Sequence, residues 1–598
     1  MSTMYEVFRV FALDAGMASS YSTRLLDQER GYTRLLKNLD MSLPGILMKR
    51  PAVRLVVDNG TELTTTQPLT GLHQFVKLST EQKFLLAAHT DRVIRREGVV
   101  WTNLITGLDP GNPVDFLTIA DQVAFSNGVD NMYIWKGDGA VETDIGAEKA
   151  TMRTFLMYEN NDLRYTAKAS GTGGNYIRVR YIKATSPTGS TTVQRTGTGT
   201  EDDPYFITVR LAWSEVEGEE IISSTGANVR TAIMNHSASN ALVEVEHVPG
   251  SDGSHAVLEM SERVLTGGYD AVKGKYLTEY RLRAVIADGS QIKLSHTGDP
   301  HLWSPNKVGS NAVEAYVSPD DGENISGLLA MGDGGILIGK PSSLYGLFGY
   351  KRENFVIDKL DPNIGVASNR SMAFSRPFGY FVGQDGVYRV QPGGIPEMIS
   401  RPILEYYNEM VDTDKLDESV GFIYDKMYLV SLPGKNGTIL FGWHTLFERP
   451  FIWTEPTGIS AVAWVDKKLY YGKSTAQGIY EVVNGIFEDY GADAIIAEIQ
   501  TLELDANFPE VEKDVGELYI IFRIADEDYE VYVDVYADGK LVIENRHATV
   551  TGVKGRQFVV RVPVGKTGRF IEVALKNDLK QQFTPMALYY TYQQKETL

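Results

Sequence analysis

The sequence predicts a mainly β protein: a β-propeller of six to seven blades with an inserted small α+β domain and a C-terminal β-sandwich. A unit of three short apolar strands joined by tight turns recurs at intervals of roughly 40–50 residues, the range of propeller blades. The recurrence is interrupted once, over residues 151–270, and long stretches after residue 490 alternate between apolar and polar residues. Together these features favour a propeller followed by a second β domain.

The best-formed unit spans residues 364–390. It combines a short apolar strand at 371–374, a turn at Arg376 and Pro377, a second strand at 380–382, a Gly-Gln-Asp-Gly turn and a third strand at 387–390. Short strands joined by Gly, Pro or Asp turns are typical of an antiparallel meander. A lone meander cannot bury its apolar face, so repetition at a fixed period predicts a closed array.

Seven copies of this unit can be aligned, two before the interruption and five after it. They span residues 73–101, 115–140, 280–303, 324–350, 364–390, 420–443 and 459–482. Four tyrosines occupy one place in the last strand of the unit: Tyr133, Tyr345, Tyr388 and Tyr480. Because tyrosine suits a half-buried pleated surface, we expect these side chains to pack one blade on the next, with ligand binding as the alternative.

The interruption reads as a compact module. It has a strand at 205–211, a helix at 225–236, a strand at 242–248 and the ending Leu-Thr-Gly-Gly-Tyr-Asp at 265–270. Gly171, Gly174 and Asn175 predict a turn, because glycine and asparagine tolerate positive φ. A phosphate-binding loop is disfavoured, since the Lys-Ser/Thr ending of such loops is missing.

The two ends of the chain have different patterns. Residues 24–39 are compatible with a short helix interrupted by Gly31, and a strand follows at 52–57. The last hundred residues, with Asp538-Gly539 as a hairpin turn, predict a β-sandwich. The expected domains are an N-terminal arm or platform segment (1–70), the first blades (71–150), the inserted α+β module (151–270), the remaining blades (271–490) and the sandwich (491–598).

Composition limits the possible functions. The net charge of −19 argues against a protein that grips nucleic acid by its phosphates, but an acidic wall lets DNA pass without sticking. A simpler interpretation is that the charge only keeps the protein soluble. There is no cysteine, and neither a secretory signal nor an apolar run long enough to span a membrane is expected.

No enzyme is predicted. The nine histidines lack metal-binding spacing and no Gly-x-Ser-x-Gly motif occurs, so we expect no catalytic residue, no cofactor and no metal. Residues 318–322 resemble the start of an Asp-box turn of sialidases but lack its terminal Trp. We interpret Asp320, Asp321 and Asp333 as acidic surface turns. Their spacing does not match an EF-hand, and a glycosidase pair of carboxylates stays an open alternative.

Several segments resemble phage tail proteins. They are Lys49-Arg50-Pro51 before its strand, residues 120–139, residues 364–403 and the inserted module with its Gly-x-x-Gly-Asn and Leu-x-Gly-Gly-x-Asp marks. The propeller units resemble the tail nozzle or packaged-DNA stabilisation proteins of short-tailed phages, the group that includes tail tubular protein B. The inserted module departs from simpler relatives and leaves the position in the tail open.

The resemblance implies a structural protein of the virion, made in the host cytoplasm. It implies a homo-oligomeric ring, which we expect to be hexameric, that contacts portal or adaptor and tail-fibre proteins, retains packaged genome and lets double-stranded DNA pass during ejection. Asp320 and Asp333 are then expected to face the lumen, and the module to lie outside the ring. The alternatives are a receptor- or glycan-binding propeller with exposed aromatics such as Trp135 and Trp303 and, less favoured, a propeller glycosidase.

Overall fold

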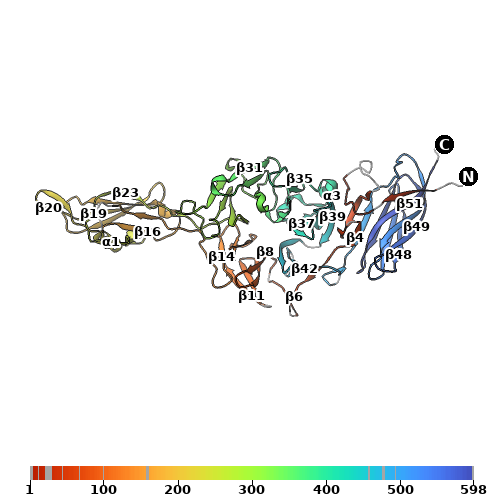
Figure 1. The fold of residues 1–598 in the computed structure, drawn as a ribbon, viewed down its shortest axis with the longest axis horizontal. Coiled ribbons are helices and arrows are strands. Elements are labelled where there is room, and N and C mark those ends of the chain that lie inside the picture. Colours follow the sequence, from red (N-terminus) through yellow and green to blue (C-terminus); the bar gives the residue numbers. More distant parts are fainter. Residues whose placement is uncertain are drawn as a thin grey trace.

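The computed structural model describes residues 5–10, 12–20, 30–43, 45–58, 60–65, 67–97, 100–155, 160–455, 458–474, 478–491 and 493–595. The molecule is elongated, with the inserted module at one end, the propeller in the middle and the β-sandwich at the other end, where both termini lie (Figure 1). Among the described residues, no helix is long and apolar enough to cross a membrane.

Six antiparallel sheets and the first four strands of a larger sheet form the seven blades of the propeller. Blade 1 consists of β8 (Gly71–Lys77), β9 (Gln82–His89), β10 (Arg92–Glu97) and β11 (Val100–Thr106). Blade 2 consists of β12 (Asp115–Ile119), β13 (Gln122–Ser126) and β14 (Tyr133–Trp135). Blade 3 consists of β24 (Tyr276–Tyr280), β25 (Arg283–Asp288), β26 (Gln291–Leu294) and β27 (Val313–Tyr316). Blades 4 and 5 consist of β28 (Gly327–Ala330), β29 (Ile336–Gly339), β30 (Leu344–Phe348) and β31 (Val356–Asp361); and β32 (Ala373–Ser375), β33 (Phe378–Val382), β34 (Val387–Val390) and β35 (Glu397–Met398). Blades 6 and 7 consist of β36 (Val420–Tyr424), β37 (Met427–Gly434), β38 (Gly437–His444) and β39 (Arg449–Glu455); and β40 (Ile459–Val465), β41 (Lys468–Lys473), β42 (Ile479–Val483) and β5 (Ala52–Leu55).

The blades close into a ring. The first strand of each blade contacts the first strand of the next, and β40 of blade 7 contacts β8 of blade 1. Apolar clusters fill the spaces between neighbouring blades: one joins Phe75 of blade 1 to Phe125 of blade 2, and another joins Leu85 of blade 1 to Val465 of blade 7. Blade 7 is completed by β5, which pairs antiparallel with β42. The predicted propeller is confirmed, with seven blades.

Several turns between the first and second strands of a blade contain no glycine. Ala120-Asp121, Arg281-Leu282, Asp425-Lys426 and Asp466-Lys467 are two-residue turns with positive φ at both positions. Such turns match the right-handed twist of a hairpin, although they usually contain Asn or Gly. Closure of the ring fixes the strands and therefore holds these residues in the left-handed region.

The inserted module is α+β. One sheet contains β15 (Thr151–Arg153), β16 (Leu163–Ala167) and β22 (Val243–His247), and the other has the order β18 (Thr192–Thr196), β19 (Tyr205–Leu211), β17 (Ile177–Lys183), β23 (Met260–Val264). Helix α1 (Gly226–Asn235) starts at a Thr225 capping box, buries Val229 and Ile233, and is followed by α2 (Ser237–Asn240). A hairpin of β20 (Trp213–Val216) and β21 (Glu219–Ile222) also belongs to the module.

The C-terminal sandwich shares a sheet with the propeller. One of its sheets has the order β1 (Glu6–Val10), β51 (Pro585–Gln594), β46 (Lys513–Arg523), β49 (Gln557–Gly568). The other contains β45 (Ala497–Thr501), β50 (Ile571–Asn577), β47 (Tyr529–Ala537) and β48 (Lys540–Val550). This second sheet continues through β2 (Thr33–Lys37) to β39 of blade 6, giving nine strands in one sheet.

The N-terminal seventy residues supply strands to both large domains. Strand β1 lies at a sandwich edge, β2 joins the sandwich to blade 6 and β5 completes blade 7. A short hairpin of β3 (Leu39–Leu43) and β4 (Ile46–Lys49) connects β2 to β5. A second one, of β6 (Val57–Asp58) and β7 (Thr61–Glu62), follows β5 and leads to blade 1. The helix expected over 24–39 is wrong within the described residues, because pairing on both sides of β2 buries Leu36 and overrides the local helix propensity. The domain boundaries stay predictions.

Candidate functional site

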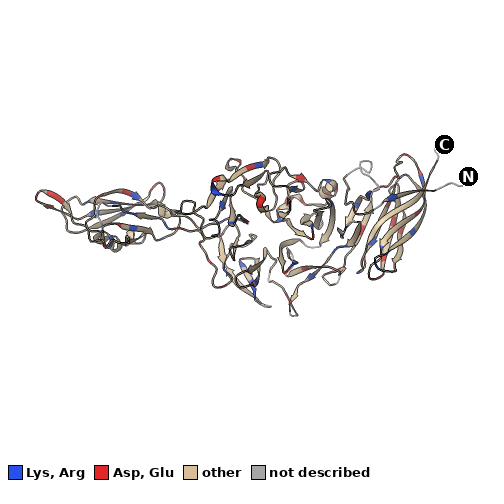
Figure 2. Ribbon diagram, viewed as in Figure 1, with Lys and Arg blue, Asp and Glu red and all other residues tan. Residues whose placement is uncertain are grey.

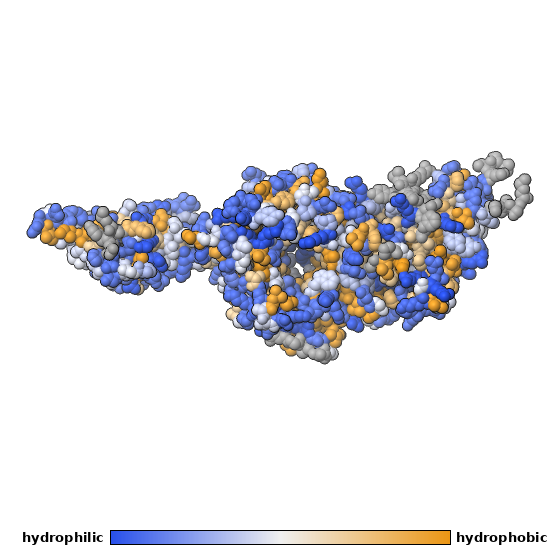
Figure 3. Space-filling model, in the orientation of Figure 1, coloured by the Kyte–Doolittle hydropathy of each residue, from blue (hydrophilic) through white to orange (hydrophobic). Residues whose placement is uncertain are grey.

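The seven innermost strands surround a channel in the middle of the propeller, where Figure 3 shows a hollow in the surface. Two cavities of about 230 and 470 Å³ occupy the channel. Both are lined by Leu72, His73, Gly421 and Val462, so they adjoin each other. The channel is the candidate site, because concave spaces with a few converging polar groups are where proteins bind small ligands.

Asp115 and Asn369 meet at the end of the channel where the innermost strands begin. Asp115 accepts hydrogen bonds at Oδ1 from Phe116 N (3.0 Å) and at Oδ2 from Leu277 N (2.8 Å). Asn369 donates from Nδ2 to Asp115 Oδ2 (3.5 Å) and accepts at Oδ1 from Leu328 N (2.9 Å). Leu277 N and Leu328 N lie on the channel side of the first strands of blades 3 and 4, where no further strand among the described residues pairs with them. The side chains of Asp115 and Asn369 supply the acceptors that these N–H groups need. Burial raises the pKa of Asp115 to about 6, although these hydrogen bonds oppose the shift.

Arg370 brings a positive charge to the same end of the channel. Its Nη1 donates to Ser460 O (3.0 Å) at the start of blade 7, and its Nη2 donates to Asp417 O (3.4 Å) before blade 6. Burial lowers the pKa of Arg370, although the nearby Asp417 and Glu418 carboxylates oppose the shift. Both hydrogen bonds go to backbone carbonyls, and no ion pair among the described residues includes Arg370.

Two further side chains at this end are neutral at pH 7. His73 Nε2 lies 2.7 Å from Thr118 Oγ1, and its ring stacks on Phe116 with centroids 5.7 Å apart. Burial lowers the pKa of His73 to about 4. Burial also raises the pKa of Tyr276 to about 12, and the Asp115 carboxylate adds to that shift. The charged side chains lining the cavity at pH 7 are therefore Asp115 and Arg370.

The four tyrosines of the repeated unit lie on the third strands of their blades, away from the channel cavities. Three of them stack on the aromatic residue opposite on the second strand: Tyr133 on Phe125 (5.3 Å), Tyr388 on Phe381 (5.6 Å) and Tyr480 on Tyr471 (5.8 Å). Tyr345 pairs with Ile338 and belongs to the apolar cluster between blades 3 and 4. Tyr388 belongs to the cluster between blades 4 and 5.

The turn of the inserted module contacts the segment where the module ends. Gly171 has a φ of 105°, and a Cβ there would lie 2.6 Å from Asp270 Oδ1. Asn175 donates from Nδ2 to Gly268 O (3.0 Å) and accepts from Gly268 N (2.8 Å). Gly174 faces Ala150 and leaves no room for a side chain. These residues clamp the two ends of the module together, so their role in the structure is mechanical.

The acidic residues singled out in the sequence are largely neutralised. Lys340, which is fully buried, donates from Nζ to Asp321 Oδ1 (2.6 Å), and this hydrogen bond lowers the pKa of Asp321. Arg281 of blade 3 donates from Nη1 to Asp333 Oδ1 (2.7 Å) of blade 4. Asp320 is exposed in the connection between the two blades.

Asp320 and Asp333 lie on opposite faces of the propeller. Asp320 is in the connection between β27 and β28, and Asp333 is in the turn between β28 and β29. Because β28 joins these two connections, they lie at its two ends. The three acidic residues are therefore not brought together at one site, and none of them lines the channel cavities.

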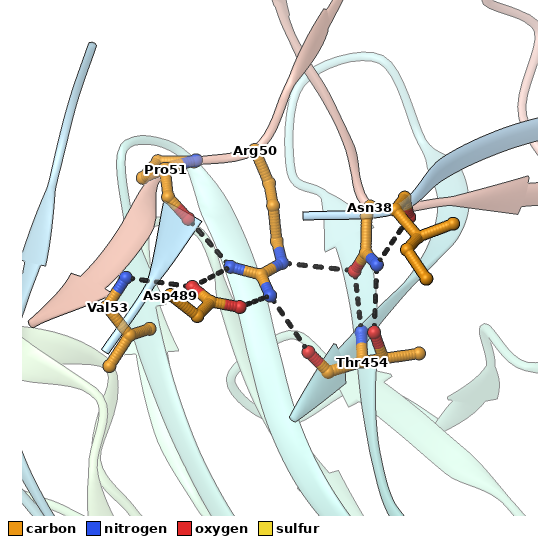
Figure 4. A network of polar contacts seen from close by, with 7 residues as sticks. Asn38, Arg50, Pro51, Val53, Thr454 and Asp489 are labelled. Atoms are coloured by element: carbon orange, nitrogen blue, oxygen red, sulfur yellow. Dashed lines mark hydrogen bonds and ion pairs between the residues drawn. The ribbon is translucent and has the colours of Figure 1, made fainter. Parts of the chain in front are cut away.

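Arg50 joins the N-terminal segment to blade 6 and to Asp489, which follows the last blade in the chain (Figure 4). It is 4% exposed and forms a two-pronged ion pair with Asp489, Nη1 to Oδ1 at 3.1 Å and Nη2 to Oδ2 at 2.5 Å. Its remaining hydrogen bonds go to Asn38 Oδ1 (3.0 Å), Pro51 O (2.8 Å) and Thr454 O (3.1 Å). Asp489, in the small sheet of β43 (Glu488–Asp489) and β44 (Asp493–Ala494), also accepts from Val53 N (3.0 Å).

The neighbouring lysine points into the sandwich. Lys49 donates from Nζ to Asn577 Oδ1 (2.5 Å) and Leu579 O (2.8 Å). Burial lowers the pKa of Lys49 to about 7, against the attraction of Asp578. Lys49 and Arg50 thus fix one short segment to the sandwich and to the propeller.

The tryptophans expected at the surface are buried. Trp135 is 0% exposed and packs against Phe75 and Phe84. Trp303 is 1% exposed, and its indole N–H donates to Pro300 O (2.6 Å). The expectation that they are exposed aromatics at blade tops is therefore wrong, because both fill spaces between blades. Trp464 is 46% exposed and lies at the wider end of the channel.

Sequence reasoning missed Asp115 and Arg370. A usable signal existed: both lie at or just before the first strand of a blade, and first strands line the channel. Nothing in the sequence, however, links blade 2 to blade 5 across the ring. In the described part of the chain, no group of histidine and acidic side chains is arranged to hold a metal ion.

Comparisons with known proteins show similarity at the level of structure. No family model and no curated protein matches the sequence. BamB from Moraxella catarrhalis is 8% identical with a TM-score of 0.32, and the alignment covers 80% of this chain and 98% of BamB. The Pan2 WD40 domain from Neurospora crassa is 10% identical with a TM-score of 0.24, covering 73% of this chain and 96% of that domain. The fold assignment rests on the seven blades themselves; the chain is a mainly β, propeller-containing protein.

Proposed function

We propose that this chain is a structural protein of a phage tail that assembles as a ring at the portal–tail channel, retains packaged genome and conducts DNA during ejection. The observation that carries the proposal is the nine-stranded sheet in which β2 links blade 6, through the pairing of Lys37 with Ile452, to the sandwich. A subunit joined in this way transmits load between its domains without a flexible linker, as a wall around a pressurised genome requires.

The segments that resemble phage tail proteins support the proposal. Lys49 and Arg50 hold the N-terminal segment to the sandwich and the propeller. Gly171 and Asn175 clamp the root of the inserted module against Gly268 and Asp270. The resemblance is therefore carried by joints of the fold, as expected for a mechanical protein.

In this proposal DNA passes between subunits and not through a single propeller. The channel of one propeller is crossed by the contact between Asp115 of blade 2 and Asn369 of blade 5. Its cavities have the size of small-ligand sites. The chain has a net charge of −19, and acidic and basic residues are interspersed along the ribbon (Figure 2); a net negative charge suits a wall that DNA slides past.

The test is the assembly state of the purified full-length chain, measured by sedimentation and mass photometry. The proposal expects a closed ring of fixed copy number, which we expect to be six. A monomer or a trimer at every concentration would contradict it. In a phage that carries the gene, variants neutralised at Asp320 and Asp333 test whether those turns face the lumen, and unchanged DNA retention and ejection would count against that part.

A further inference from the structure

The channel contains a guanidinium with no carboxylate partner. Arg370 donates to the Ser460 and Asp417 carbonyls, and its charge is not balanced by an ion pair with any described residue. Arg370 is partly buried, and the nearby Asp417 and Glu418 carboxylates compensate its charge without forming an ion pair with it. A partly buried cation of this kind is stabilised further when a ligand of opposite charge binds to it directly. The carbonyl oxygens carry only partial negative charge, so the site retains attraction for an anion.

The space in front of Arg370 has the size and composition of a ligand site. The cavity of about 230 Å³ that it lines adjoins the cavity of about 470 Å³. The second cavity has a wall of mixed character, and Phe374, Phe422 and Trp464 contribute to its apolar part. Sites for small organic molecules usually combine apolar side chains with a few polar groups that fix the orientation of the ligand.

We propose that the central channel binds a small organic carboxylate, with its carboxylate group at Arg370 and its carbon skeleton directed towards the apolar part of the second cavity. The guanidinium favours this class of ligand, because its planar fork matches the geometry of a carboxylate. The site goes beyond the structural role proposed above and does not depend on it, since every lining residue belongs to one propeller.

Asp115 gives the site a pH dependence. Asp115 lines the same cavity as Arg370, and its ionised carboxylate repels an anionic ligand. The other groups nearby do not change charge between pH 5.5 and 7.5: His73 and Tyr276 stay neutral, and Arg370 stays charged. Because the pKa of Asp115 is about 6, binding is expected to weaken by several fold as the pH rises from 5.5 to 7.5. The negative charges of Asp417 and Glu418 also act on Arg370 and oppose the lowering of its pKa.

The experiment is calorimetric titration of the full-length protein with benzoate, and with benzyl alcohol as a neutral probe of similar shape. Arg370→Gln removes the cation, and Arg370→Lys retains the charge without the fork. Arg352→Gln is the matched control, because Arg352 also donates to a backbone carbonyl, Pro305 O at 3.0 Å, but is exposed and lies away from the cavities. Thermal unfolding of each variant reports whether it is folded.

The expected result is that benzoate binds the wild type and Arg352→Gln equally, at least tenfold more tightly than benzyl alcohol does. Arg370→Gln is expected to lose at least tenfold in affinity, and Arg370→Lys to lose less. Equal binding of the two probes, no benzoate binding at pH 5.5, or full retention in Arg370→Gln would overturn the proposal. If Arg370→Gln does not fold, the comparison of the two probes on the wild type and on Arg370→Lys decides the question. Ring assembly is read separately, so either proposal can fail alone.

Discussion

Replacement of Arg50 by methionine is expected to loosen the contact between the N-terminal segment and the propeller. Methionine retains much of the side-chain volume but removes the cation from Asp489, whose side chain is 10% exposed. Breaking a buried ion pair by removing one partner costs about 3–5 kcal/mol. The hydrogen bonds to Asn38 Oδ1 and to the Pro51 and Thr454 carbonyls are also lost. The loss should be local to strands β5 and β39.

Hydrogen exchange followed by mass spectrometry is the appropriate assay, because a chain with several domains does not unfold in one step. Local opening that becomes easier by about 3–5 kcal/mol speeds exchange by ~100-fold or more. The amides of residues 52–55 should show this change. Arg54→Met is the control: Arg54 is 55% exposed, and its partner Glu481 keeps Lys468 at 3.1 Å, so the expected cost is below about 1 kcal/mol.

A double variant, Arg50→Met with Asp489→Asn, removes both charges and keeps an amide oxygen at position 489 that can accept from Val53 N. Removal of both charges leaves no uncompensated carboxylate, so the double variant should exchange more slowly at residues 52–55 than Arg50→Met alone. The reasoning is refuted if Arg50→Met exchanges at the rate of Arg54→Met, or if the double variant is no slower than the single one.

Three further predictions concern other joints of the fold. Gly171→Ala should destabilise the base of the inserted module by about 1–3 kcal/mol, because φ is positive at residue 171 and Asp270 occupies the space that a Cβ would need. Limited proteolysis near residue 171 should therefore become faster. An unchanged rate of proteolysis would contradict the clamp. Asp321→Ala should destabilise blade 4 by about 3 kcal/mol, because it leaves the buried Lys340 cation without its carboxylate partner. Asp320→Ala should change stability by less than about 0.5 kcal/mol. Equal unfolding midpoints of the two variants would contradict this. The pKa of Lys49 is about 7 in the folded protein, below its ordinary value of 10.5. Between pH 7 and pH 10.5 the unfolded chain therefore binds more protons at this lysine than the folded protein does. As a result, the free energy of unfolding rises with pH across that range. Denaturant melts of wild type and Lys49→Met from pH 7 to 10 should show this rise only in the wild type.

The blades were predictable because their signal is local. Six of the blades are runs of consecutive short strands, and blade 7 is such a run completed by β5, so apolar segments and turns mark each blade even where the turns lack glycine, as at Arg281-Leu282. The shared position of the four tyrosines in the repeated unit was also predictable, because Tyr388 pairs with Phe381 in a neighbouring strand of the same meander. Local pairing of this kind leaves its trace in one stretch of sequence.

Contacts between distant parts of the chain left no such trace. Phe8 of β1 pairs with Tyr590 of β51, near the other end of the chain, and no pattern in either strand identifies its partner. The channel site is likewise assembled from separate blades, so Asp115 and Arg370 could not be related before the ring was closed. The exposure of Trp135 and Trp303 was predicted wrongly for the same reason. Whether an aromatic residue lies between blades or on their surface depends on how neighbouring blades pack.

The measurement that tests the central claim most directly is electron cryomicroscopy of the assembled full-length protein. The account predicts a ring with one wide opening on its symmetry axis, bounded by several subunits, while the channel inside each propeller stays narrow and crossed by Asp115 and Asn369. A particle without a shared axial opening would contradict the proposal, as would one in which a single propeller channel forms the only passage.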